Sequence, residues 1–136
     1  MLKLGLPVLF AAGILGCGSS TRAPGSTTLT LPGATQIDIV AGDCAIVNTQ
    51  PQMIPASTVS YNLVDAYGTD SLEVGIVPSS DTCQFAQYQT FVDDTFTGSA
   101  APPSAEVPAG TYDLDIICQN LAADCLISSV TWSATY

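Results

Sequence analysis

Residues 28–136 contain a series of short segments in which apolar and polar residues alternate, as in strands that bury one face. The clearest segment places Val59, Tyr61 and Leu63 on one face, with polar residues between them. The segments with strand character are 28–32, 35–41, 44–49, 57–66, 70–78, 83–92, 94–98, 111–118 and 125–136. These segments predict about seven to nine short strands.

Glycine and proline interrupt the chain throughout, and no long window has the periodicity of a helix. Pro32 and Gly33 are expected to form a turn between two strands, and residues 99–110 a loop rich in proline and alanine. We therefore predict an all-β fold, a single antiparallel β-sandwich of jelly-roll-like character, for residues 28–136.

The last two predicted strands each have one apolar face. The inward positions are Tyr112, Leu114, Ile116 and Cys118 in the first strand, and Leu126, Val130, Trp132 and Ala134 in the second. Trp132 is thus expected in the core rather than on the surface as a platform for sugar stacking. Cys125 falls on the opposite face from Leu126, so a bond from Cys118 to Cys125 would need a loop position or a β-bulge.

The charge balance is strongly acidic, with two basic residues, twelve acidic ones and a net charge of −10 over 136 residues. The basic residues are Lys3 and Arg22, and the chain has no histidine. A domain without cations cannot neutralise phosphates, which excludes nucleic acid as a partner. The same acidity argues against direct adhesion of the domain to anionic lipid.

The N-terminal segment has the order of an export signal, with Lys3 followed by an apolar run over residues 4–15. The run is about a dozen residues long, and a membrane-spanning helix needs about 20. A secretory signal is therefore expected in place of a transmembrane helix.

The end of this signal is Ile14-Leu15-Gly16-Cys17. It resembles the bacterial lipobox, in which an aliphatic and a small residue precede a cysteine. The resemblance implies cleavage before Cys17 and attachment of lipid to its sulfur, with a membrane anchor that two or three acyl chains make stable. The alternative is that Cys17 is an ordinary residue of a signal or anchor.

The resemblance divides the chain into a lipoprotein signal peptide (1–16), a flexible lipidated tether (17–27) and the sandwich (28–136). The tether is short, polar and rich in glycine and proline, which predicts coil. The expected location is the cell envelope. The residues after Cys17 lack the aspartate that keeps many lipoproteins in the inner membrane, which favours the outer membrane in an organism with two.

Four of the five cysteines lie in the predicted sandwich. An even number in an exported domain predicts disulfide bonds. The short spacing favours Cys118–Cys125, which leaves Cys44–Cys83, and the other pairings stay open. Zinc is disfavoured because the chain has no histidine and no pair of cysteines at CxxC spacing.

Most catalytic chemistry is absent from the sequence. Without histidine there is no Ser/His/Asp or Cys/His site, and without lysine beyond the signal there is no Schiff-base chemistry. Paired carboxylates, as in glycosidases, remain as a third functional class. A domain of about 110 residues leaves little room for a catalytic cleft beside a core, and no enzymatic activity is expected.

The acidic residues offer the remaining candidate chemistry. Asp93 and Asp94 are adjacent, and Asp65 and Asp70 bracket a turn. These four are weak candidates for a calcium site, because calcium binds six to eight oxygens and sandwich loops can supply them. No calcium-loop motif is present, so no cofactor is expected and calcium is the alternative.

Asp113 and Asp115 lie two apart, so a strand places both on one outward face. The preferred interpretation of the acidic residues is a solvated surface that keeps the domain soluble. Tyr67 and Tyr88 are the tyrosines expected to be exposed.

The segment EVPAGTYDLDI, residues 106–116, is similar to a turn and strand of small secreted bacterial β-sandwiches such as pre-peptidase C-terminal domains. The resemblance implies a Pro-Ala-Gly turn and a strand that Tyr112 opens toward the core. It supports the sandwich, and a function argued from fold alone is analogy.

These observations predict a lipid-anchored envelope protein whose sandwich is non-catalytic and either structural or interaction-mediating. Its partners would be the membrane, through the lipid on Cys17, and a protein or glycan of unknown identity. The alternative is a ligand-binding module for carbohydrate or calcium. Exposed aromatic residues on one face or clustered aspartate oxygens would favour that alternative.

Overall fold

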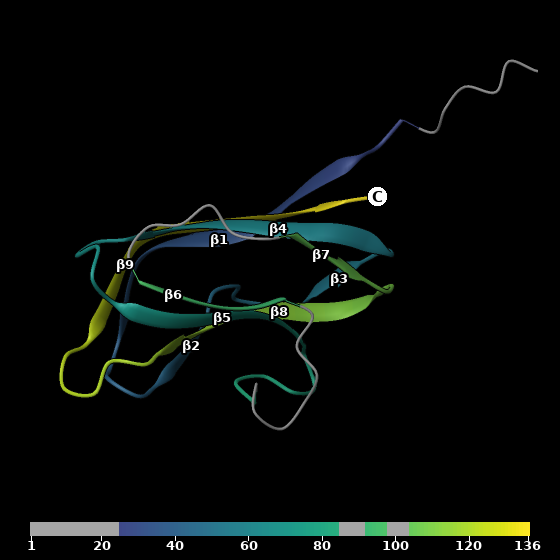
Figure 1. Ribbon diagram of the computed structural model, residues 1–136. Helices are drawn as coiled ribbons and strands as arrows, with labels where there is room; N and C mark the ends of the chain where they lie inside the picture. Colours follow the sequence, from purple (N-terminus) through teal and green to yellow (C-terminus); the bar gives the residue numbers. More distant parts are fainter. Residues whose placement is uncertain (1–24, 85–91, 98–103) are drawn as a thin grey trace, which may run out of the picture.

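The computed structural model describes residues 25–84 and 104–136, and the backbone of 92–97. The described residues form nine strands in two antiparallel sheets that lie face to face (Figure 1), so the predicted all-β sandwich is confirmed. The strands are β1 (Thr28–Ile39), β2 (Cys44–Ile46), β3 (Gln52–Ile54), β4 (Ser57–Asp65), β5 (Ser71–Pro78), β6 (Val92–Thr97), β7 (Ser104–Val107), β8 (Gly110–Cys118) and β9 (Cys125–Thr135). In this part of the chain there is no helix long and apolar enough to cross a membrane.

One sheet has the strand order β1-β9-β4-β7. The other has the order β2-β8-β5-β6, and β3 also pairs with β8. Most connections therefore pass from one sheet to the other. This arrangement gathers the loops at the two ends of the sandwich.

The two ends of the sandwich differ. At the terminal end, Thr27 and Tyr136 exchange two backbone hydrogen bonds of 2.8 and 3.0 Å. The antiparallel pairing places the β4–β5 loop (66–70) and the β8–β9 loop (119–124) at the opposite end, called the loop end here. Figure 1 shows the C-terminus on the right and the β8–β9 loop on the left.

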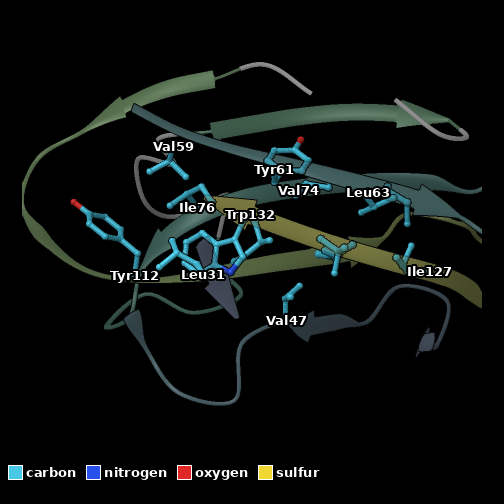
Figure 2. Close-up of a cluster of buried hydrophobic side chains, with 14 of the residues drawn as sticks. Leu31, Val47, Val59, Tyr61, Leu63, Val74, Ile76, Tyr112, Ile127 and Trp132 are labelled. Carbon is cyan, nitrogen blue, oxygen red and sulfur yellow. The ribbon is translucent and has the colours of Figure 1, made fainter. Parts of the chain in front are cut away.

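The core lies between the sheets and contains most of the predicted apolar positions (Figure 2). Val59, Tyr61 and Leu63 of β4 are 3% exposed or less, as the alternation predicts. Trp132 is 2% exposed, and its indole N–H donates a 2.7 Å hydrogen bond to the Pro32 carbonyl. Burial of each large side chain of this kind contributes about 1.5–3 kcal/mol.

The expectation of a turn at Pro32-Gly33 is wrong, because β1 runs through both residues. The register of β1 against β9 shifts at this point, which is the signature of a β-bulge. Proline is tolerated because β1 is an edge strand. A Cβ on Gly33 would lie 2.2 Å from the Val130 carbonyl oxygen, so the close approach of the two backbones requires glycine.

The inward position expected for Leu126 is also wrong. Cys125 and Ile127 are fully buried, and Leu126 is only half-buried. The register between β9 and β4 skips Ser128, so a bulge there reverses the alternation on its N-terminal side. Opposite it on β1, Gln36 has a positive φ of 54°. The bulge therefore turns Cys125 inward, which the alternation alone did not show.

Two disulfides have the pairing that the sequence favours. Cys118–Cys125 joins the end of β8 to the start of β9, with Cα atoms 5.7 Å apart, and so links the two sheets. Cys44–Cys83 joins β2 to the segment that follows β5, with Cα atoms 6.0 Å apart. Each bond is expected to stabilise the fold by about 2–4 kcal/mol.

The segment 106–116 forms the turn and strand that its sequence predicts. The Tyr112 hydroxyl donates a 2.9 Å hydrogen bond to the Pro108 carbonyl, four residues earlier. Such a bond closes the corner between strands of different sheets in many β-sandwiches. It fixes the start of β8, the strand that carries Asp113 and Asp115.

Candidate functional site

Two carboxylates are buried on the outer face of the sheet that contains β8. Asp113 and Asp115 alternate with core residues and point away from the core, as predicted, but they are only 3% and 0% exposed. The segment 79–84, called the covering segment here, makes hydrogen bonds to both of them. The prediction of a solvated acidic surface is therefore wrong for these two residues.

Asp113 has a hydrogen-bond donor on each oxygen. Oδ1 accepts a 2.9 Å bond from the Asn48 amide, and Oδ2 accepts a 2.8 Å bond from the Thr82 hydroxyl. Asn48 is buried as well, and its Oδ1 accepts a 2.8 Å bond from the Leu114 N–H. Residues 25–136 contain no Lys, Arg or His, so the donors that these residues offer to Asp113 are all neutral.

Among the described residues, Asp115 has a hydrogen-bond donor on only one of its two oxygens. Oδ2 accepts a 2.7 Å bond from the Cys83 N–H. Oδ1 is buried, and no group of the described residues donates a hydrogen bond to it. Burial raises the pKa of Asp115 to about 6, the Cys83 N–H opposes this rise, and the nearby Asp113 charge adds to it.

The Cys44–Cys83 disulfide lies beside this carboxylate. The two sulfurs and an oxygen of Asp115 all lie within 4.8 Å of one another. This spacing suits a metal ion, but the S–S bond leaves neither sulfur as the thiolate that binds metals. Cys83 has a positive φ of 59°, a strained conformation for a residue other than glycine.

Asp65 and Asp70 are buried acceptors of hydrogen bonds at the loop end. Asp65 accepts 2.9 Å bonds from the N–H groups of Tyr67 and Asp70. Asp70 accepts 3.0 Å bonds from the Asn120 amide and the Leu126 N–H. Burial raises the pKa of Asp65, but the N–H donors outweigh it and lower that pKa overall. Both residues are 4% exposed. Asp65 thus closes its own loop, and Asp70 connects this loop to Asn120 of the other loop and to the start of β9.

An open depression of about 800 Å³ lies beside these loops. Its large exposed apolar side chains are Tyr67, 64% exposed as predicted, and Leu121, which is fully exposed. The lining residues are Tyr67, Thr69, Asp70, Asn120, Leu121, Ala122, Ala123 and Asp124. An aromatic ring beside amide and carboxylate groups can contact both apolar and polar parts of a ligand.

The other candidate residues are less well defined. The backbones of Asp93 and Asp94 lie in β6, and their side chains are outside the described part of the structure. Cys17 and Tyr88 lie outside the described residues altogether. Sequence reasoning missed Asn48 and Thr82, because only the packing of distant segments brings them to Asp113.

Comparison of the chain with protein-family models, curated proteins and solved structures gave no match.

Proposed function

We propose that the protein is a lipid-anchored protein of the bacterial cell envelope whose non-catalytic sandwich mediates an interaction with another envelope component. The N-terminal sequence supports the anchor, because Ile14-Leu15-Gly16-Cys17 resembles a lipobox at the end of an apolar run. Lipid on Cys17 would hold the domain at the membrane through the short polar segment 18–27.

The interaction role is inferred from the position of the exposed loop side chains. The chain enters the sandwich at the terminal end, where Thr27 pairs with Tyr136. Tyr67 and Leu121 are exposed at the opposite end of the strands. A domain tethered at its terminal end would present these two side chains away from the lipid. Exposed apolar side chains around a depression are typical of contact surfaces.

Replacement of Cys17 by alanine tests the anchor. The variant should accumulate unprocessed or leave the membrane fraction, whereas wild type should begin at Cys17 and carry acyl mass. Gly18→Ala is the matched control and should be processed as wild type. A Cys17→Ala chain that stays in the membrane at the mature size would disprove the anchor.

A photoreactive amino acid at position 121 tests the interaction surface in cells. We expect covalent adducts with an envelope component at this site and none at Thr28, which is exposed at the terminal end. Adducts at Thr28 alone, or at neither site, would contradict the proposed surface.

The depression also supports a second candidate, a carbohydrate-binding module. Tyr67 offers a ring for stacking, and Asn120 and Asp124 offer polar groups for sugar hydroxyls. Titration with soluble envelope oligosaccharides tests this function, with Tyr67→Ala expected to abolish binding and Tyr136→Ala to leave it intact. We do not propose calcium, because Asp65 and Asp70 are 4% exposed and no group of three carboxylates lies together among the described residues.

A further inference from the structure

The two disulfides lie in different environments. Both cysteines of Cys118–Cys125 are fully buried in the core. Cys44 and Cys83 are half-buried, and their bond holds the covering segment against β2. A thiol reductant can therefore reach Cys44–Cys83 more easily than Cys118–Cys125, since exchange requires direct attack on a sulfur atom.

The carboxylate of Asp115, beside Cys44–Cys83, is unusual because it is fully buried while the described part of the chain offers a donor to only one of its oxygens. Oδ1 of Asp115 has no donor among the described residues, although a buried acceptor without a partner is costly. The two sulfurs of the disulfide lie within 4.8 Å of an oxygen of Asp115, and they would carry S–H groups after reduction. The reduced pair can thus offer the carboxylate a hydrogen-bond donor, which the oxidised pair cannot.

We propose that Cys44–Cys83 is an exchangeable disulfide that a dithiol reductant reduces, and that Asp115 exchanges protons with its sulfurs. A thiolate of the reductant attacks one sulfur, the Cys44–Cys83 bond breaks, and a mixed disulfide forms. The second cysteine leaves as a thiolate and takes a proton from the Asp115 carboxyl. The second thiol of the reductant ionises and attacks the reductant sulfur of the mixed disulfide, so that the first cysteine leaves as a thiolate and the reductant departs as a cyclic or protein disulfide. The two protons lost by the reductant thiols pass through solvent, one to this thiolate and one back to Asp115.

The net reaction transfers two electrons and two protons from the reductant to the cysteine pair. It releases the covering segment from β2, and the strained φ of 59° at Cys83 is then free to relax. This proposal concerns the sandwich alone and does not depend on the lipid anchor.

The surroundings of Asp115 set the expected pH dependence. Asp113 is the charged group that acts on it among the described residues. The other titratable residues on the elements around it are acidic: Asp43 before β2, Glu73 on β5, Asp81 in the covering segment and, in register opposite Gly75, Asp93 on β6. With no cation near it, Asp115 above its pKa of about 6 repels an incoming thiolate, and below that pKa it can supply a proton.

The test compares the two disulfides within one molecule. The purified full chain is treated with dithiothreitol at several pH values, trapped with N-ethylmaleimide and digested with pepsin for mass spectrometry. Both bonds react with the same reductant, and the fraction of dithiothreitol that is ionised affects both rates equally. The ratio of the two reduction rates therefore does not depend on this fraction. We expect Cys44–Cys83 to react faster, and the ratio to fall by about tenfold as pH rises through about 6.

Two variants assign the effect to a residue. Asp115→Asn should remove the pH step and speed the reduction of Cys44–Cys83 above pH 6, because the amide stays neutral. Asp113→Asn is the matched control, since it removes one neighbouring charge and should keep the step. A step that survives Asp115→Asn, or that both variants remove equally, would overturn the role of Asp115.

The wild-type protein alone also decides the proposal if a variant does not fold. Equal reduction rates for the two disulfides would rule out Cys44–Cys83 as the exchangeable bond. A rate ratio that does not change between about pH 5 and pH 8 would rule out proton exchange with Asp115.

Discussion

Replacement of Asp115 by asparagine should flatten the pH dependence of stability. The folded protein protonates this carboxyl below about pH 6, whereas the unfolded chain does so only near its ordinary pKa of 3.8. Between these values the folded state holds one more proton, so stability falls as pH rises. Because each pKa unit corresponds to about 1.4 kcal/mol, the full penalty above pH 6 is about 3 kcal/mol.

Only part of this penalty is released in an accessible range. Between about pH 7.5 and pH 5, protonation of Asp115 should raise the free energy of unfolding by about 1.4 kcal/mol. Asp115→Asn should lose this rise. At neutral pH the variant should gain less than the full penalty of about 3 kcal/mol. The reason is that the new amide N–H₂ takes the place of Oδ1 and has no acceptor among the described residues.

Urea unfolding followed by Trp132 fluorescence measures the effect, since Trp132 is the only tryptophan and is buried. With a slope of about 1 kcal/mol per molar urea, the wild-type midpoint should shift by about 1.4 M between the two pH values. Asp113→Asn controls for net charge and should keep most of the shift, because Asp115 remains. An equal shift in wild type and Asp115→Asn would refute the buried-charge argument.

Three further predictions concern stability and use the same urea assay. Gly33→Ala should destabilise the fold by about 1–3 kcal/mol, since its Cβ would clash with a carbonyl of β9. Gly25→Ala is the control and should have no effect, because a Cβ there meets nothing within 4 Å. Equal effects of the two substitutions would contradict the bulge. Asp70→Ala should cost about 2–4 kcal/mol, because it leaves a buried N–H and an amide without their acceptor; a change below about 0.5 kcal/mol would argue against its structural role. Replacing both Cys118 and Cys125 by serine should cost at least about 2–3 kcal/mol; an unchanged midpoint would contradict a stabilising link between the sheets.

The alternation of apolar and polar residues was sufficient for the fold class and for much of the core. Val59, Tyr61 and Leu63 are buried as the pattern predicts, and so is Trp132. The reason is that a strand places successive side chains on opposite faces, so the residues that must leave water are visible in the local sequence. The spacing of the cysteines likewise favoured the pairing that the structure contains.

The tertiary structure decided which regular patterns are interrupted. At Ser128 and at Pro32-Gly33 the bulges depend on the register of β9 against β4 and of β1 against β9. Register is a property of paired strands, and each partner lies far away in the sequence. Local alternation therefore placed Leu126 inward and left Cys125 outside.

The sequence by itself determined a β-sandwich with acidic side chains on an outward face of one strand. It also showed one pair of cysteines before these acidic residues in the chain and a second pair after them. Only the tertiary structure placed the covering segment over Asp115 and brought Cys44 and Cys83 beside it. The physical reason is that burial of a polar group depends on what packs above it. For an outward-facing residue that cover comes from another part of the chain, and here it changes a solvated carboxylate into a buried one with a raised pKa.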